Sequence, residues 1–260
     1  MISSTHNPLV QRARKLRKRG LRARTREFLV EGAHGITEAF SAGQTPELLF
    51  LTESAPVELA DLARASRVPV HAVSEPVMKL ISDAENPPGA VAVVPFVDVE
   101  PGRLLACPTD LAVVLAGVQD PGNLGTTLRT ARAAGAGAVF LTEGTVDLYN
   151  AKVVRASAGA LFRVSVAREV AVPWVLAGLG SRGFRRIAAV PTAPTAYDEV
   201  DMSGPCALVF GNEARGLGDD VLAAVDERAS IPMDERAESL NVGISAAVFL
   251  FEVSRQRRAR

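Results

Sequence analysis

The 260-residue sequence contains only two cysteines and three histidines, and this shortage excludes several classes of protein. Two thiols are too few for the disulfide framework of a small secreted domain, and neither lies in a cluster of metal-binding side chains. The histidines (His6, His34 and His71) all fall in the first third, without the ligand spacing of a zinc site. The sequence therefore predicts no bound metal and a reduced, cytoplasmic setting.

Long apolar runs are also missing. No run approaches the roughly 18 residues of a membrane-spanning helix, and the N-terminus lacks the apolar centre of a signal peptide. Apolar residues still make up 48% of the chain and charged residues 22%, which is typical of a globular protein with a substantial core. We expect one large domain or two of ordinary size, with no membrane partner.

Acidic residues are absent from residues 1–26, although the whole chain carries no net charge. Nine of the 29 Lys and Arg side chains lie in this stretch, so the remaining sequence is acidic overall. A basic arm of this kind indicates contact with a polyanion such as nucleic acid, although a solvated helix face would have the same composition. The candidate RNA-binding side chains are Arg12, Arg14, Lys15, Arg17, Lys18, Arg19 and Arg22.

The order of apolar segments predicts two α/β domains. Residues 1–96 alternate short strands with helices and form a small domain, and the stretch 97–108, with two prolines and no clear periodicity, is the predicted linker. Residues 109–260 alternate nearly continuous apolar strands with helices, which is typical of a parallel sheet covered on both faces. These strands are expected at 111–118, 138–142, 185–190, 206–211 and 229–232.

The turn that follows the strand at 111–118 lacks both familiar nucleotide-binding patterns. Its glycines do not form G-x-G-x-x-G, and no lysine occurs in 111–151, so a dinucleotide and a nucleoside triphosphate are both poorly supported. A helix expected from about Leu124 still offers backbone N–H groups to an anion such as an RNA phosphate. Asn123 and Arg129 lie where ligands bind in parallel sheets, although alone they could be a helix cap and a surface arginine.

Two later stretches carry polar groups in similar settings. The segment LVFGNEARGLGDD (208–220) leads a strand into a glycine-rich loop with Glu213. The segment IPMDERAESLN (231–241) puts Ser239 and Asn241 at the start of a last helix, where Ser239 could be the cap and Asn241 could lie in the first turn. Capping explains one of these polar residues but not the whole set.

Taken together, the three stretches resemble the SpoU (TrmH-like) family of RNA 2′-O-ribose methyltransferases in the SPOUT superfamily. The matching motifs are an Asn with an Arg six residues later, a strand entering a G-x-E loop, and I-P-M followed by S-L-N. They cover roughly 109–260, and residues 1–95 resemble the substrate-binding domain of ribosomal-RNA members. The resemblance implies S-adenosylmethionine as methyl donor, RNA as substrate, a C-terminal trefoil knot, and a homodimer that packs through the last helix.

The resemblance also implies roles for individual residues. The catalytic set is Asn123, Arg129, Glu213, Ser239 and Asn241. The positions whose backbone surrounds the cofactor are Gly211, Ile231 and Leu240. Arg155, in VVRASAGALFR, matches a family segment and is a further candidate RNA contact, with a helix-surface arginine as the alternative.

The sequence does not identify the group that removes the 2′-hydroxyl proton. The family assigns activation of the hydroxyl to the arginine, but an arginine is a poor base because its pKa stays near 12.5 or above. We therefore expect Arg129 to grip the adjacent phosphate and to stabilise developing alkoxide charge. Glu213 is the only conventional base in the set, and it could instead orient Asn123 or Arg129.

The predicted activity is S-adenosylmethionine-dependent 2′-O-methylation of large-subunit ribosomal RNA. The front domain favours this substrate over transfer RNA. An oxidoreductase on a doubly wound sheet is a second class, which the missing glycine pattern disfavours. A third class is a non-catalytic RNA-binding protein on the same scaffold. The complete motif set disfavours this class, because a protein that only binds RNA has no need of it.

Overall fold

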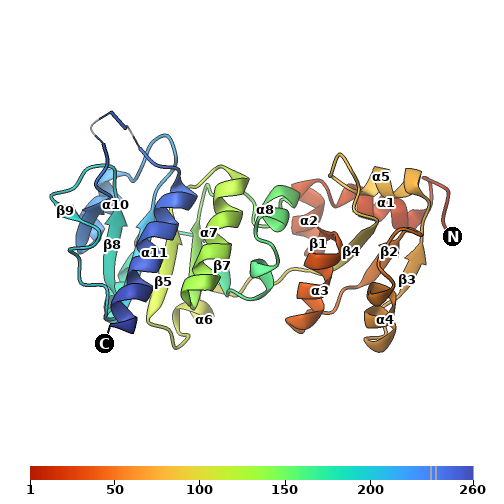
Figure 1. Cartoon of the computed structure of the whole chain (residues 1–260), viewed down its shortest axis with the longest axis horizontal. Helices are drawn as coiled ribbons and strands as arrows, with labels where there is room; N and C mark the ends of the chain where they lie inside the picture. Colours follow the sequence, from red (N-terminus) through yellow and green to blue (C-terminus); the bar gives the residue numbers. More distant parts are fainter. Residues whose placement is uncertain (235, 238, 260) are drawn as a thin grey trace. The chain divides into compact units, whose positions relative to one another are not determined.

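The computed structural model describes residues 1–234, 236–237 and 239–259, and it divides into two compact units (Figure 1). Met1–Val97 and Asp147–Phe162 form the first unit, and Asp98–Val146 and Arg163–Arg260 form the second. The first unit therefore takes a segment from the middle of the chain, which the composition of the sequence does not indicate. No helix among the described residues has the length and apolarity needed to cross a bilayer.

The first unit is built on a mixed four-stranded sheet with the strand order β1-β4-β2-β3. Strand β4 is antiparallel to both of its neighbours, and β2 and β3 are parallel. The strands are β1 (Glu27–Glu31), β2 (Leu48–Leu51), β3 (Val70–Ala72) and β4 (Ala90–Pro95). The helices are α1 (Pro8–Lys15), α2 (Arg19–Thr25), α3 (Ala33–Ser41), α4 (Val57–Ala65), α5 (Glu75–Ile81), α8 (Ala151–Ala156) and the 3₁₀ turn η1 (Ala160–Phe162).

The basic arm is folded as α1 and α2. Asn7 caps α1 by accepting the Leu9 N–H at 2.9 Å, and Pro8 occupies the first turn, where its missing N–H costs nothing. Val10, Ala13 and Leu16 are buried in the core of the unit, so the charged side chains lie on the opposite, solvated side of an anchored helix.

The segment 147–162 completes the aromatic part of this core. Tyr149 is 1% exposed and stacks on Phe96 with ring centroids 3.7 Å apart, while its hydroxyl accepts the Val97 N–H at 2.8 Å. Phe28 packs against Tyr149 and also against Phe162 at the end of the segment. The burial of these rings holds 147–162 to the first unit.

The second unit contains a seven-stranded sheet with the order β7-β6-β5-β10-β8-β11-β9, and every ladder in it is parallel. The parallel sheet predicted from the sequence is thus confirmed. The strands are β5 (Leu111–Leu115), β6 (Ala138–Thr142), β7 (Val166–Val170), β8 (Arg185–Ala189), β9 (Thr195–Ala196), β10 (Cys206–Phe210) and β11 (Glu227–Ser230). The helices are α6 (Pro101–Leu105), α7 (Pro121–Ala134), α9 (Val172–Ser181), α10 (Asp219–Ala224) and α11 (Val242–Arg258).

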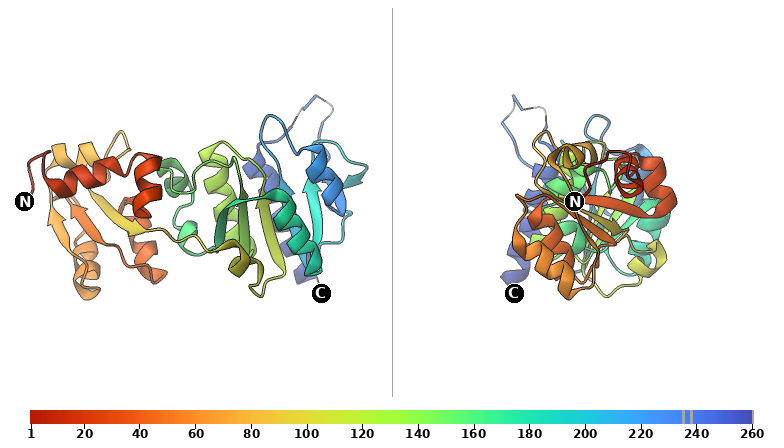
Figure 2. Two further views of the ribbon diagram at one scale, coloured as in Figure 1. Left: turned by 180° about the vertical axis from the view of Figure 1, so that it is seen from behind. Right: turned by 90° about the vertical axis from the view of Figure 1, so that its right-hand side faces the viewer.

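Helices cover both faces of this sheet. Helices α7 and α11 lie side by side on one face (Figure 1), and α6, α9 and α10 cover the other (Figure 2). Leu104 of α6 is fully buried in the core on that second face, so part of the stretch predicted as a linker belongs to the packed second unit. The trefoil knot implied by the family resemblance stays a prediction.

The centre of the sheet positions the candidate site. Strands β5 and β10 are neighbours, with Leu115 paired to Phe210 at their carboxyl ends. From β5 the sheet continues through β6 to β7 on one side and through β10 to β8 on the other. The strand order therefore reverses direction between β5 and β10. Loops that leave such a point diverge and form the usual ligand crevice of an open α/β sheet.

Candidate active site

The loop after β5 leads into α7, which begins at Pro121 and not near Leu124 as the sequence pattern predicts. Asp120 is the cap, and its carboxylate accepts the Asn123 N–H at 2.8 Å. The interpretation of Asn123 as a cap was therefore wrong. A proline directly after an aspartate is itself a helix-start signal, because Pro fits the first helical position and Asp accepts the unpaired N–H groups.

Asn123 lies inside the first turn of α7, only 6% exposed, and connects two distant segments. Its amide nitrogen donates to Glu213 at 2.9 Å, and its amide oxygen accepts from the Asn241 side chain at 2.6 Å. Because a carboxylate can only accept, the Asn123 NH₂ group must face Glu213, and its oxygen must face Asn241. Three predicted site residues thus form one hydrogen-bonded chain.

Glu213 follows β10 and caps the turn that precedes α7. Its two carboxylate oxygens accept the backbone N–H groups of Gln119 and Asp120, both at 3.0 Å, as well as the Asn123 amide. Partial burial alone would raise the pKa of the Glu213 carboxyl, but these donors together hold that pKa below its ordinary value. The carboxylate therefore stays ionised at neutral pH. The negative charge next to the start of α7 is thus that of a side chain of the protein.

Asn241 is the cap of the last helix. Its side-chain oxygen accepts the Ile244 N–H at 3.2 Å, while its amide nitrogen donates to Asn123. Helix α11 accordingly begins at Val242, and Ser239, which the sequence pattern offered as the cap, lies two residues before Asn241. One carboxamide thus fixes the start of α11 and joins it to α7.

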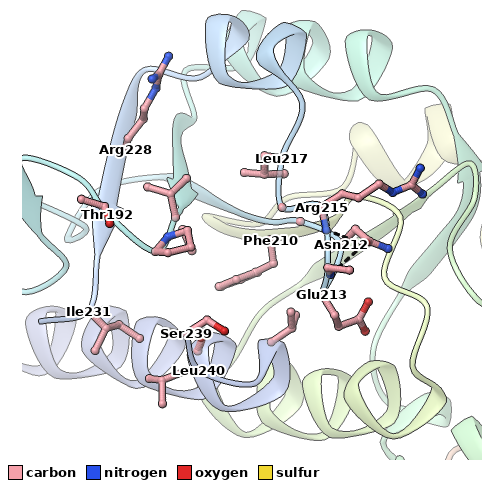
Figure 3. A pocket seen from close by; sticks show the side chains of 18 of the residues that line it. Thr192, Phe210, Asn212, Glu213, Arg215, Leu217, Arg228, Ile231, Ser239 and Leu240 are labelled. Atoms are coloured by element: carbon pink, nitrogen blue, oxygen red, sulfur yellow. Dashed lines mark hydrogen bonds between the residues drawn. The ribbon is translucent and has the colours of Figure 1, made fainter. Parts of the chain in front are cut away.

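A cavity of about 480 Å³ opens beside this chain of hydrogen bonds (Figure 3). The predicted cofactor positions Gly211, Ile231 and Leu240 all line it. Glu213 and Ser239 line it as well, and Figure 3 shows them with Ile231 and Leu240. Its volume is within the usual range for a small-molecule site. Among the described residues, no group of three or more His, Cys, Asp or Glu side chains could hold a metal ion.

The wall formed by residues 211–217 is a tight loop. A Cβ at Gly211 would lie 2.4 Å from the carbonyl carbon of Gly216, so only glycine fits there. Asn212 holds the loop through a backbone pair with Gly216, and its side-chain oxygen accepts the N–H groups of Ala214 and Arg215, both at 3.0 Å. The backbone at the cavity wall is thereby fixed.

The cavity also has two cationic side chains that the motif comparison did not identify. Arg215 lies next to Asn212, and Arg228 lies across the cavity (Figure 3). Arg228 donates to the Leu222 carbonyl at 3.1 Å. Nothing in their spacing distinguishes them from the many other arginines of the chain.

Arg129 does not join the Asn123 network. It follows Asn123 by six residues, or about 1.7 turns of an α-helix, which takes it toward the other side of α7. Its side chain is exposed, does not line the cavity, and has no hydrogen bond or ion pair with any residue that the structure describes. The Asn–Arg motif thus places one polar group inside the unit and a cation on its surface.

Several predicted RNA-binding arginines, including Arg12, Arg17, Arg22 and Arg155, have partners within the first unit. Arg12 pairs with Glu27 and Glu47, and Arg22, which is buried, pairs with Asp147. Arg17 pairs with Asp83 at 2.8 Å, and Arg155 lies 3.7 Å from both Glu31 and Asp83. The remaining candidates, Arg14, Lys15, Lys18 and Arg19, are exposed. RNA contact by any member of this set stays a prediction.

Comparison with known proteins agrees with this geometry. Residues 110–251 match the SpoU rRNA Methylase family, and residues 7–92 match the MRM3-like substrate binding domain. A 23S rRNA (guanosine(2553)-2′-O)-methyltransferase of Bacillus subtilis, RlmP, is 33% identical over 254 residues, which is 97% of this chain and 98% of that protein.

Solved structures of related enzymes agree with these sequence matches. An AdoMet-bound rRNA methyltransferase from Sinorhizobium meliloti superimposes with a TM-score of 0.88 at 30% identity, over 98% of this chain and 97% of that one. A TrmH/SpoU tRNA modifying enzyme from A. aeolicus covers only 61% of this chain and 82% of its own, with a TM-score of 0.51 at 25% identity. The chain belongs to the SpoU rRNA methylase family.

Proposed function

We propose that the protein methylates the 2′-hydroxyl of a ribose in large-subunit ribosomal RNA, with S-adenosylmethionine as methyl donor. The observation that carries this proposal is the cavity beside the Glu213–Asn123–Asn241 chain of hydrogen bonds, because that chain joins the motif residues of three segments in one place. The substrate class is supported by the first unit. The ribosomal-RNA relatives match nearly the whole chain, whereas the transfer-RNA enzyme matches 61% of it.

The cavity suits this cofactor. Its walls combine apolar side chains such as Ile231 and Leu240 with the close backbone approach at Gly211, so an adenosine ring could be held by apolar packing and backbone groups. When bound, S-adenosylmethionine supplies a methyl group activated by a sulfonium centre. Everything else in the reaction, including orientation of the hydroxyl and stabilisation of its charge, falls to the residues of the chain.

Glu213 acts in this proposal as a positioning residue. Both of its oxygens already accept N–H groups, and its lowered pKa makes it a weaker proton acceptor than an ordinary glutamate. Its role is to hold the turn before α7 and to orient the Asn123 amide, which in turn bonds to Asn241. This arrangement keeps the edge of the cavity rigid.

Arg129 acts as the phosphate-binding cation. Its exposed guanidinium, without a partner among the described residues, is available to a phosphate of the RNA and to the negative charge that develops on the ribose oxygen. An arginine cannot serve as the base at neutral pH. We assign Arg129 to electrostatic stabilisation.

A homodimer through the last helix is part of the proposal. Ile244 and Phe251 are 51% and 48% exposed, and they lie two turns apart on one side of α11. This apolar strip is on the helical layer that α11 shares with α7, which carries Arg129 (Figure 1). Burial of the strip against a second copy would remove it from water.

The test is methyl transfer from labelled S-adenosylmethionine to unmodified RNA, followed by nuclease mapping of alkali-resistant linkages. Large-subunit ribosomal RNA transcribed in vitro should accept label at an alkali-resistant dinucleotide, because a methylated 2′-oxygen blocks base hydrolysis. Label confined to transfer RNA would replace the proposed substrate. Absence of label from both RNAs, with cofactor binding demonstrated, would overturn the catalytic proposal.

A further inference from the structure

A second, smaller cavity lies within the first unit and takes no part in the site described above. It measures about 120 Å³. Its lining comes from the α1–α2 turn, β1, the loop after α5, and the segment that enters α8. The polar members of that lining are Arg17, Arg22, Glu31, Asp83, Tyr149 and Asn150.

Two of these polar groups are fixed parts of the wall. The Arg22 side chain is 8% exposed, pairs with Asp147, and donates to the carbonyl oxygens of Leu16 and Arg17 at 2.9 and 2.8 Å. The Glu31 carboxylate is 3% exposed and accepts the Ser82 hydroxyl at 2.7 Å and the Asp83 N–H at 2.8 Å. Their hydrogen-bonding capacity is used within the protein, so they shape the cavity.

Asp83 and Arg17 are the accessible pair. Their side chains are 33% and 42% exposed, and they contact each other at 2.8 Å. Asn150, whose side-chain oxygen accepts the Lys152 N–H at 2.9 Å, also lines the cavity. A carboxylate, a guanidinium and a carboxamide thus lie at one small cavity.

The charges of this lining disfavour an anion. Arg17 pairs with the lining carboxylate of Asp83, and Arg22 pairs with Asp147 behind the wall. The two lining carboxylates, Glu31 and Asp83, each also lie 3.7 Å from Arg155. Three cations are thus matched by three carboxylates, with no excess of positive charge. A phosphate would have to compete with those carboxylates. The arrangement suits a neutral, planar group that offers donors to a carboxylate and acceptors to a guanidinium, which describes a nucleobase.

We propose that this cavity takes a single guanine base of the bound RNA, with Asp83 accepting from its N1–H and N2–H₂ groups and Arg17 donating to O6 and N7. Guanine is selected because it alone among the four bases has two adjacent N–H donors for one carboxylate and two adjacent acceptors for one guanidinium. The proposal rests on the proposed function only in taking RNA as the ligand. It adds base recognition by the first unit, whereas the methyl-transfer cavity belongs to the second.

The experiment measures binding of three 11-nucleotide oligouridines, carrying a central guanosine, inosine or adenosine, to the full-length protein without cofactor. Inosine lacks the N2 amino group and so loses one hydrogen bond to the carboxylate. We expect the guanosine oligonucleotide to bind about 10-fold or more tightly than either of the others, the usual scale for a bidentate base contact. The Asp83→Asn variant should lower this preference to about 2-fold or less.

The matched control is Asp61→Asn, which removes the carboxylate of an exposed ion pair with Arg64 in the same unit and should leave the preference intact. Equal binding of the three oligonucleotides by wild type would overturn the proposal, and so would a preference that survives Asp83→Asn. If Asp83→Asn unfolds the unit, equal binding of the guanosine and inosine oligonucleotides by wild type still overturns the proposal. Because no methyl transfer is measured, loss of guanine preference and loss of catalysis are separate results.

Discussion

Replacing Glu213 by glutamine tests whether this residue positions the site or removes the proton. In the wild type the carboxylate accepts three N–H groups at 2.9–3.0 Å. If the oxygen of the new carboxamide keeps the Asp120 and Asn123 donors, the NH₂ group of the same carboxamide must face the Gln119 N–H. Two donors then face each other, so the hydrogen bond from Gln119 is lost. The two that remain lose their charge assistance, which roughly halves their strength.

The magnitude follows from these bonds. A hydrogen bond to a charged group contributes about 1.5–3 kcal/mol, and solvent access to the exposed Glu213 side chain lowers its net value. We therefore expect Glu213→Gln to reduce the free energy of unfolding of the second unit by about 2 kcal/mol at pH 7. Misplacement of Asn123 should lower the single-turnover methyl-transfer rate about 10- to 100-fold.

The pH dependence provides an independent check. Because the pKa of Glu213 is lowered in the folded protein, its stabilising contribution is present above the unfolded value near 4.5 and is lost as the pH falls through the folded value. The stability difference between wild type and Glu213→Gln should therefore shrink as the pH falls from 7 to below 4.5. Chemical denaturation at several pH values measures it.

The refuting result is equally specific. If Glu213 is the base, the variant should lose about 10²- to 10⁴-fold in rate, lose the acidic limb of the pH–rate profile, and unfold like wild type. That combination would contradict the positioning role. Glu143→Gln is the matched control, because the Glu143 side chain is exposed and has no hydrogen bond with the described residues.

Three further predictions concern other parts of the second unit. Arg129→Ala should abolish methyl transfer and leave the cofactor Kd and the unfolding temperature unchanged, because the Arg129 side chain does not line the cavity and has no hydrogen bond or ion pair with the described residues; wild-type turnover would refute its role. Gly211→Ala should weaken cofactor binding about 5- to 100-fold by calorimetry, because its Cβ would lie 2.4 Å from Gly216, whereas Gly204→Ala, with open space around it, should bind normally. Phe251→Glu should convert a dimer to a monomer in light scattering without loss of fold, whereas Phe249→Ala, at a side chain 1% exposed, should destabilise the unit by about 3–5 kcal/mol.

The central strands of the second unit could be predicted from sequence because each is buried on both faces. Strands β5, β6 and β10 are apolar along almost their whole length, so composition alone identifies them. Edge strand β7 was missed because Arg168 and Glu169 interrupt its apolar pattern, and Glu169 has a φ of 57° where the ladder shifts register. Strand β9 has two residues, too few for any periodicity.

The site was predictable as a set of motifs but not as a geometry. Asn123 lies 90 residues before Glu213 and 118 residues before Asn241, and only the fold shows that Asn123 bridges the other two. The cap interpretation failed because it ignored Asp120 and Pro121, which already supply the helix start. The cavity could not be derived either, since contacts made by backbone groups such as that of Gly211 leave little pattern in the side chains.

The segment 147–162 has a consequence for synthesis of the chain. When Val97 has emerged from the ribosome, all strands of the first unit's sheet are present, but Tyr149 and Phe162 of the same unit's core have not yet been synthesised. About 65 more residues must emerge, which takes roughly 3–13 s at ordinary elongation rates. During that interval β5 and β6 of the second unit also appear, so the first unit cannot complete its core before part of the second unit has been synthesised.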